Sequence, residues 1–398
     1  MPAIELTIQD VVYGGSGLAR LDGCVVFVPG VIPGEKVSAE TVKRHKTYAE
    51  ARLVEVLEPS PHRRHPVCPL AGVCPGCSYQ HMTYAEEVRI KAAQLANFLR
   101  RQVGPDRAAA VFQPPVASPC DTGYRNKIVL HASVEDGRTC LGYKGRDNRT
   151  VLDVPACPLA MDPINGRLAE RRADAHFMDT LKPGMSVTFR HTGKDGTLMW
   201  KDDTGPGKER LTEATVLGPM RVSRRSFFQV NPPVGDALAE RVMALVKEHR
   251  PETVVDLYCG IGIFALAASN AGAQRVVGID SDAEAIHAAV SNGEKLETGN
   301  ADFIAGPVGG RLRDALARGS PGTTLVIVDP PRRGLEPDVA DALAASGVPR
   351  VAYISCAPDT LARDVARLTQ VGWHVASTQA FDMFPRTASF ESITVLEK

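Results

Sequence analysis

The sequence predicts an α/β protein whose C-terminal part is a doubly wound parallel sheet, preceded by a small β-barrel and a β-rich central region. From residue 251 onward, apolar strand patterns alternate with helical patterns, as expected of a parallel sheet covered by helices. Residues 1–57 contain only short strand patterns separated by glycine and proline turns, which is typical of a small barrel. With 398 residues the chain exceeds one ordinary core, so we expect two or three domains.

The composition is that of a globular protein without a membrane span. Hydrophobic residues make up 44% of the chain and charged residues 23%. No uninterrupted apolar run approaches the roughly 18 residues of a transmembrane helix. The first residues lack the basic and then apolar pattern of a signal peptide, which predicts a cytoplasmic protein. A net charge of zero argues against a generic basic nucleic-acid binder, although a local basic patch is hidden in such a sum.

The individual elements follow from these patterns in chain order. The barrel is expected to use strands at 4–8, 24–28, 35–39 and 50–56. A proline-rich linker at 59–66 and a helix over 83–101 follow, with the C-terminal domain as one candidate packing partner of that helix; residues 115–222 are β-rich without an assignable topology. The C-terminal sheet is expected to use strands at 254–258, 275–280, 325–329, 350–355 and 373–379 and a last β-rich run at 391–396. We therefore divide the chain into domains at 1–58, 59–222 and 223–398.

A glycine turn follows the first strand of the C-terminal sheet. Gly260 and Gly262 open a helical pattern, so a ligand can approach the backbone N–H groups at the start of that helix. The pattern is not a full dinucleotide fingerprint, because Ala265 stands at the place of the third glycine. A tight strand–helix turn without a ligand is the plainer interpretation of this feature.

Carboxylates at the strand ends indicate which ligand the turn would take. Asp256 precedes the glycine turn, Asp280 ends the next strand and Asp329 ends a later one. Ligands of open α/β sheets bind at the carboxyl ends of the strands. These carboxylates suit the ammonium and ribose groups of S-adenosylmethionine better than a dinucleotide, whose pyrophosphate would need room. Asp302 is a candidate adenine contact, with an unliganded loop residue as the alternative.

A cysteine, Cys356, stands at the end of another expected strand. The Asp329-Pro-Pro turn upstream is similar to that of amino-methyltransferases, but Arg332 replaces the aromatic residue that holds an exocyclic amine. A thiolate suits another reaction: its addition to carbon 6 of a pyrimidine makes carbon 5 nucleophilic enough to take a methyl group. Asp382 and Glu391 are the candidate bases for the carbon-5 proton. The alternative is that the thiol only fills the core.

Four further cysteines have a spacing that indicates a shared ligand. Cys68, Cys74 and Cys77 form a C-x5-C-x2-C run, and Cys157 lies far downstream. Zinc sites usually combine two short pairs, so a distant single fourth ligand fits an iron–sulfur cluster better. Nine cysteines in a reducing compartment favour metal, cluster or catalytic use over disulfides. Scattered unliganded thiols are the alternative.

Five motifs in order resemble those of the bacterial RNA uracil-C5 methyltransferases. They read QVNP (229–232), DLYCGIG (256–262), DPPRRG (329–334), SCAPDTLARD (355–364) and DMFP with a later Glu (382–391). The resemblance implies a Rossmann-like class I methyltransferase fold, S-adenosylmethionine as cofactor and RNA as substrate. It implies that Cys356 is the nucleophile, that Glu391 is the base, and that the cofactor is contacted by Gln229, Tyr258, Asp280 and Asp329, to which the glycine turn and the adenine site add Gly260 and Asp302.

The resemblance also bears on the target. Ribosomal-RNA members of the family carry a four-cysteine [4Fe-4S] site that transfer-RNA members generally lack, so 23S ribosomal RNA is favoured over transfer RNA. Residues 1–58 resemble the TRAM domain, an RNA-binding barrel, with contacts expected from basic and aromatic residues: Arg20, Lys36, Lys43, Arg44, Lys46 and Tyr48. Residues 124–127 resemble a family strand at the RNA surface. Four departures concern the pocket rim and the target nucleotide: Ala357, Ile263, Arg386 and Ser389.

The sequence therefore predicts an enzyme that methylates carbon 5 of a uridine in RNA, acting as a monomer with no membrane partner. Two other enzyme functions stay open, a transfer-RNA uracil-C5 methyltransferase and an N-methyltransferase of an exocyclic amine. A non-enzymatic RNA-binding assembly factor is a further alternative, which the presence of Cys356 and Glu391 disfavours.

Overall fold

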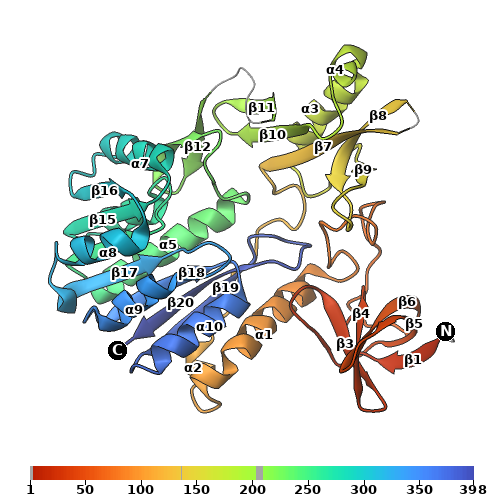
Figure 1. The fold of residues 1–398 in the computed structure, drawn as a ribbon, viewed down its shortest axis with the longest axis horizontal. Helices are drawn as coiled ribbons and strands as arrows, with labels where there is room; N and C mark the ends of the chain where they lie inside the picture. Colours follow the sequence, from red (N-terminus) through yellow and green to blue (C-terminus); the bar gives the residue numbers. More distant parts are fainter. Residues whose placement is uncertain (1–2, 136, 203–208) are drawn as a thin grey trace. The chain divides into compact units, whose positions relative to one another are not determined.

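The computed structural model describes residues 3–135, 137–202 and 209–398 (Figure 1). Its contacts group the chain into two compact units that are discontinuous in sequence. The first unit comprises Met1–Gln94, Cys120–Val187 and Phe384–Ser389, and the second comprises Leu95–Pro119, Thr188–Met383 and Phe390–Lys398. The three segments expected from the sequence do not coincide with these units, because the central segment is shared between them.

The first unit is mostly β-structure. Its elements are β1 (Ile4–Thr7), β2 (Asp10–Val11), β3 (Ser16–Leu21), β4 (Cys24–Pro29), β5 (Lys36–Arg44), β6 (Tyr48–Glu58), β7 (Lys127–Glu135), β8 (Arg138–Lys144), β9 (Val151–Asp153), α3 (Asp162–Ala173) and α4 (Ala175–Asp179). Helix α1 (Tyr84–Val103) and strand β10 (Ser186–Thr192) each contain residues of both units. Helices α3 and α4 fall in the region expected to be β-rich.

The second unit contains the remaining elements. They are α2 (Ala108–Val111), β11 (Gly196–Lys201), β12 (Arg210–Thr215), β13 (Gly218–Ser223), α5 (Pro232–His249), β14 (Thr253–Leu257), α6 (Ile263–Asn270), β15 (Arg275–Asp280), α7 (Ala283–Lys295), β16 (Ala301–Ala305), α8 (Val308–Leu316), the 3-10 turn Pro321–Thr323, β17 (Thr324–Val328), α9 (Pro337–Ala345), β18 (Arg350–Ser355), α10 (Pro358–Thr369), β19 (His374–Phe381) and β20 (Glu391–Glu397).

The N-terminal strands form a curled six-stranded sheet in the order β1-β5-β6-β4-β3-β2. Alternate side chains of these strands face inward, as in Lys36–Arg44, where Val37 and Ala39 are buried and their neighbours are partly exposed. Two-residue periodicity of this kind is what a sheet with one buried face requires. The small barrel expected from the turn pattern is therefore confirmed as a barrel-like sheet with its own apolar core.

The second unit is built on a seven-stranded sheet in the order β16-β15-β14-β17-β18-β20-β19. Strands β14 to β18 pair in parallel, while β20 pairs antiparallel with both β18 and β19. Helices cover both faces of this sheet (Figure 1). Helix α5 packs on α6, and α9 contacts both α8 and α10. Strands β14 and β17 are buried at every residue, as expected of central parallel strands. The expected class I methyltransferase fold is confirmed.

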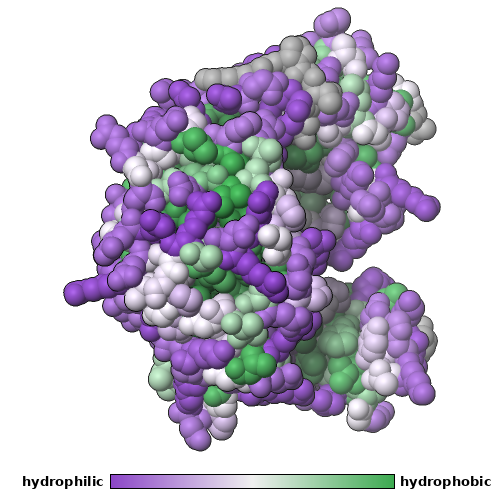
Figure 2. Space-filling view, turned by 60° about the vertical axis from the view of Figure 1, so that its left-hand side comes forward, coloured by the Kyte–Doolittle hydropathy of each residue, from purple (hydrophilic) through white to green (hydrophobic). Residues whose placement is uncertain are grey.

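The face of the molecule in Figure 2 is largely hydrophilic, with hydrophobic patches between hydrophilic residues. Across residues 3–135, 137–202 and 209–398, no helix is long and apolar enough to cross a membrane.

Candidate active site

The site lies where the parallel strands of the second unit end. Because β14, β15, β17 and β18 run in the same direction, their carboxyl ends meet at one edge of the sheet. Tyr258, Asp280, Asp329 and Cys356 occupy or directly follow these four strand ends. The fold thus brings together side chains that are almost a hundred residues apart in sequence.

The turn between β14 and α6 is shaped by glycine. Gly262 has a φ of 86°, and a Cβ at this position would lie 2.9 Å from a ring carbon of Phe303. Gly260 has a φ of 53°, and its N–H donates to the Asp280 carboxylate at 2.8 Å. Both positions need left-handed backbone, which glycine adopts without steric cost. Tyr258 adopts a φ of 65° despite its side chain, and its hydroxyl bonds to Glu336.

A cavity of about 200 Å³ opens beside this turn. It is lined by Gln229, Tyr258, Gly260, Asp280 and Asp329 together with Ser226, Phe227, Phe228, Cys259, Ile261, Ile263, Phe264, Asp282 and Ala285. Five of the six residues predicted to contact the cofactor therefore surround one cavity.

Asp302 is the sixth, and the structure does not bring it to the cavity. It lies on β16, its side chain is 66% exposed, and it pairs with Arg318 at 3.2 Å. Residue 303 is the one that points toward the glycine turn, because Phe303 packs against Gly262 and Gly278. Successive side chains of a strand face opposite sides, so Asp302 faces away. The prediction of an adenine contact from Asp302 is corrected accordingly.

Asp256 stabilises the turn through a hydrogen bond to the first turn of α6. Its Oδ2 accepts a hydrogen bond from the Ala265 N–H at 2.9 Å, while its Oδ1 has no partner among the described residues. Burial, followed by the charges of Asp329 and Asp280, raises the pKa of Asp256 well above its ordinary value. Burial and Asp280 also raise the pKa of Asp329 to about 7. Clustered buried carboxylates of this kind favour a cationic ligand.

Cys356 and Glu391 are brought to the same end of two paired strands. Strands β18 and β20 are antiparallel, with Ser355 paired with Ser392, and the Ser392 hydroxyl donates to the Ser355 carbonyl at 3.2 Å. Cys356 directly follows β18 at a bend, and Glu391 is the first residue of β20, so both lie at the same end of this strand pair. The charge of Glu391 acts on the Cys356 thiol. The thiol and the carboxylate therefore lie near each other at this edge of the sheet.

Electrostatic interactions link this pair to the residues of the Asp-Pro-Pro-Arg turn. Burial, then the charges of Glu391 and Asp329, raises the pKa of the Cys356 thiol to about 11, and the Arg332 guanidinium opposes this by its charge and a hydrogen bond. Burial and Asp329 raise the pKa of Glu391 well above its ordinary value, again opposed by Arg332.

The four candidate ligand cysteines all belong to the first unit and are partly buried. Gln80 links two of them, since it accepts from the Cys68 N–H at 3.0 Å and donates to the Cys77 sulfur at 3.2 Å. Burial raises the pKa of Cys77 to about 12, with further contributions from Cys157, Cys74 and Cys68. Within the described part of the chain, no group of three or more His, Cys, Asp or Glu side chains is arranged to hold a metal ion.

Several residues of the site were not predicted from the sequence. Phe227 is 71% exposed and lines the cavity next to Phe228 and Gln229. The aromatic pair before Gln229 was the only indication of this in the sequence. From the sequence, Arg332 was noted only because it replaces an aromatic residue. In the structure, its positive charge acts on both Cys356 and Glu391.

Residues 124–127 also differ from expectation. Tyr124 and Asn126 are buried, so these two side chains are not available at an RNA surface. Of the four departures from the family pattern, Ile263 lines the cavity and Ala357 directly precedes α10. Arg386 and Ser389 belong to the first unit.

The comparisons with known proteins point to the same family as the sequence motifs do. The family description "tRNA (Uracil-5-)-methyltransferase" matches residues 218–398, and that of the TRAM domain matches residues 3–54. A 23S rRNA (uracil(1939)-C(5))-methyltransferase of Acidithiobacillus ferrooxidans is 31% identical over 99% of this chain and 97% of its own length. An uncharacterized RNA methyltransferase of Gloeobacter violaceus is 29% identical over 99% of this chain and 96% of its own.

Among solved structures, the fold resembles a Pyrococcus abyssi tRNA (uracil-54, C5)-methyltransferase in complex with S-adenosyl-L-homocysteine. That structure aligns with a TM-score of 0.73 and 24% identity over 99% of this chain and all of the other. The matches therefore extend over both units, and not only over the sheet that carries the cavity. The chain belongs to the family of S-adenosylmethionine-dependent RNA (uracil-C5) methyltransferases.

Proposed function

We propose that this enzyme methylates carbon 5 of a uridine in 23S ribosomal RNA through a covalent adduct with Cys356. The observation that carries the proposal is that Cys356 and Glu391 lie at the same end of the paired strands β18 and β20, where Glu391, Asp329 and Arg332 act electrostatically on the thiol. An attacking thiol and a base at the same edge of the sheet are the two groups that this reaction requires.

The reaction proceeds in three steps. Cys356, after losing its proton to solvent, adds to carbon 6 of the uracil, and the electron pair of the ring double bond moves toward carbon 5 and the carbonyl. Carbon 5 then displaces S-adenosylhomocysteine from the sulfonium methyl. Glu391 takes the carbon-5 proton, the double bond re-forms, and the Cys356 thiolate leaves carbon 6. Arg332 stabilises the thiolate and the carboxylate, whose pKa values it lowers.

S-adenosylmethionine would occupy the cavity at the glycine turn. Asp280 and Tyr258 would bind its adenosine part, and Gly260 would allow that part to approach the backbone closely. Asp329 and Gln229 would face its cationic end. Burial, followed by the charges of neighbouring carboxylates, raises the pKa values of Asp256 and Asp329, so a cation bound there would be favoured.

This arrangement predicts that cofactor affinity depends on pH. The pKa of Asp329 is raised to about 7. Below that pH the carboxyl is protonated, so a cationic cofactor that binds the carboxylate must displace this proton. We expect affinity to rise by up to about tenfold per pH unit below pH 7 and to level off above it. Calorimetry between pH 6 and 8, in buffers with different ionisation enthalpies, measures both the affinity and the released proton.

The matched variants are Asp329→Asn and Asp302→Asn. The first should bind weakly and without this pH dependence, because it cannot ionise. The second changes an exposed aspartate outside the cavity and should behave like the wild type. A pH-independent affinity in the wild type would contradict the role given to Asp329.

We further propose that Cys68, Cys74, Cys77 and Cys157 hold a [4Fe-4S] cluster. Four thiols with no histidine or carboxylate among them match the donor set of such clusters. The four influence one another electrostatically, and Gln80 bonds to the backbone of one and the sulfur of another. When bound, the cluster would cross-link the cysteine-rich segment to residues near 157 and stabilise the first unit.

Anaerobic purification tests the cluster. We expect about four iron and four sulfide per chain, with visible thiolate-to-iron absorption, as four-cysteine ligation implies. Cys77→Ser should lose most of the iron and lower the melting temperature, because metal binding adds to folding stability. Cys120→Ser, which alters an exposed cysteine outside the set, should retain both. Stoichiometric zinc, or iron that survives Cys77→Ser, would refute the assignment.

The RNA would contact both units. In the N-terminal sheet, Lys43, Arg44 and Lys46 are exposed beside Tyr48, whose ring stacks on His45 at 4.2 Å between centroids. Basic residues around aromatic rings are typical of single-stranded RNA sites. In the second unit, the exposed Phe227 ring lies at the cavity and would stack on a base next to the flipped uridine.

The choice of 23S ribosomal RNA follows from the cysteine set and from the named activity of the Acidithiobacillus relative. We propose that the enzyme acts in the cytoplasm as a monomer, because all the site residues named above belong to one chain. Mass-spectrometric mapping of 5-methyluridine in RNA from cells with and without the gene tests the target. Loss of one 5-methyluridine from 23S ribosomal RNA is the expected result. Loss from transfer RNA alone, or an N-methylated base as product, would contradict it.

A further inference from the structure

The segment Phe384–Ser389 occupies an unusual position in the chain. It connects β19 to β20, both in the second unit, yet its own contacts group it with the first unit. Glu391 follows Ser389 by only two residues and belongs to the second unit. Contacts that fix this segment therefore also restrict, through the covalent chain, the position of Glu391, the proposed base.

Three successive backbone carbonyls of the segment are held by residues of the first unit. Lys91 donates to the Phe384 carbonyl at 3.1 Å and Tyr124 donates to the Pro385 carbonyl at 3.0 Å. The carbonyl of Arg386 accepts from the N–H groups of Ser78 at 2.9 Å and Tyr79 at 3.1 Å. A loop with every one of these carbonyls paired is fixed far more tightly than an ordinary surface connection.

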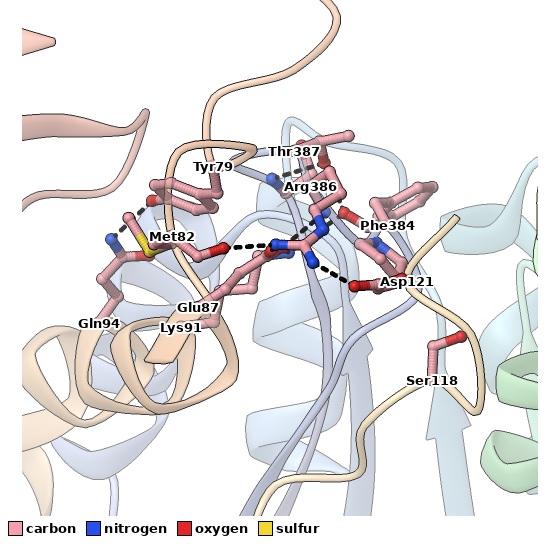
Figure 3. A network of polar contacts seen from close by, with 12 residues as sticks. Tyr79, Met82, Glu87, Lys91, Gln94, Ser118, Asp121, Phe384, Arg386 and Thr387 are labelled. Carbon is pink, nitrogen blue, oxygen red and sulfur yellow. Dashed lines mark hydrogen bonds and ion pairs between the residues drawn. The ribbon is translucent and has the colours of Figure 1, made fainter. Parts of the chain in front are cut away.

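Arg386 is at the centre of this network (Figure 3). Its N–H donates to the Glu87 carboxylate at 2.6 Å, and its guanidinium donates to the Met82 carbonyl at 2.8 Å and pairs with Asp121. Glu87 is fully buried and also bonds to the buried Lys91 at 2.7 Å. Buried charges persist only when paired, so removing one partner leaves the others uncompensated.

The backbone of Arg386 reinforces this conclusion. Its φ of 68° is in the left-handed region, which is uncommon for a residue with a long side chain. Backbone of this kind persists where the surroundings over-determine it. Here the N–H, the carbonyl and the guanidinium of one residue are all engaged, and they supply that constraint.

We propose that Arg386 is a positioning residue for the base of the reaction: by anchoring residues 384–389 to α1 and to the segment that follows Cys77, it sets the placement of Glu391. The inference rests on the proposed function, in which Glu391 removes the carbon-5 proton. It assigns to Arg386 an effect on the resolution of the covalent intermediate, and none on cofactor binding.

The test uses Arg386→Lys, which keeps the charge but loses the planar fork that bonds Met82 and Asp121 together. With ordinary uridine RNA, we expect methylated enzyme–RNA adduct to accumulate on denaturing gels and kcat to fall by about 10–100-fold, as for a misplaced catalytic group. S-adenosylmethionine affinity should stay within a factor of about two of the wild type, since no cofactor contact changes. Asp121→Asn, which removes the charge of one partner, should also raise the adduct fraction and lower kcat, but by less.

Arg63→Lys is the matched control. Arg63 also forks onto a fully buried carboxylate, Glu35, and onto the Gly30 carbonyl. Its backbone forms a bridge with Met82, which the substitution keeps, and its side chain bonds to Glu35 and Gly30 rather than to residues 384–389. Its adduct fraction should equal that of the wild type even if stability falls. Adduct resolution at the wild-type rate in Arg386→Lys, or equal adduct fractions in Arg386→Lys and Arg63→Lys, would overturn the inference. Failure of the wild type to form an adduct with 5-fluorouridine RNA would instead refute the proposed function.

Discussion

Replacement of Cys356 by alanine is expected to abolish methyl transfer, with a loss of at least about 10⁴-fold, or some 5 kcal/mol of barrier. Carbon 5 of a uracil is too weak a nucleophile to attack the sulfonium methyl unaided, so the reaction has no second route at this site. Folding and cofactor affinity should change little, because Cys356 is only partly buried and is not among the residues that line the cavity. Radiolabelled methyl incorporation into RNA is the measurement.

The control for this variant is Cys140→Ala, which alters another partly buried thiol, on β8 of the first unit. It should keep wild-type turnover. Measurable multiple turnover in Cys356→Ala would mean that the thiol is not the nucleophile and would favour direct methylation of an amine.

Replacement of Glu391 by glutamine should produce a different defect. Glutamine cannot accept the carbon-5 proton, so the enzyme should methylate one RNA and then remain attached to it, with turnover falling by about 10³-fold. Adduct formation itself should not be slowed. The charge of Glu391 raises the pKa of the Cys356 thiol, so its removal lowers that pKa and increases the thiolate fraction.

Single-turnover incorporation of methyl groups, compared with steady-state turnover, separates the two steps. The expected result is near-normal incorporation of one methyl group per enzyme, a stable methylated adduct, and almost no further product. If Glu391→Gln turns over like the wild type and Asp382→Asn instead traps the adduct, the base is Asp382 and the assignment of Glu391 is wrong.

The sequence alone was sufficient for most of the catalytic sheet. The central strands are continuous runs of Val, Ile and Leu, which are buried on both faces and easily recognised, as in Thr324–Val328. Strand β16 was missed because it is an edge strand with no fully buried residue. Because the strand was missed, Asp302 was expected as an adenine contact or a loop residue. In the structure it lies on β16, and the alternation of side chains along that strand turns it away from the cavity.

The helices α3 and α4 were missed for a related reason. The sequence Asp162–Ala173 is rich in arginine and buries only Ile164 and Leu168, so its apolar periodicity is weak. The relations that matter most at the site are long-range. Arg332 next to Cys356 and Glu391, and Arg386 next to Glu87, depend on strand order and on the return of the chain from one unit to the other, which no local pattern contains.

The covalent intermediate itself is the most direct test of the account. A fluorine at carbon 5 cannot be removed by a base as a proton is, so RNA containing 5-fluorouridine at the target should be methylated once and stay bound to the enzyme. We predict one RNA-linked peptide, attached through Cys356, with the methyl group of S-adenosylmethionine on the same base. Absence of any adduct in the wild type, or an adduct that persists in Cys356→Ala, would contradict covalent catalysis by this cysteine.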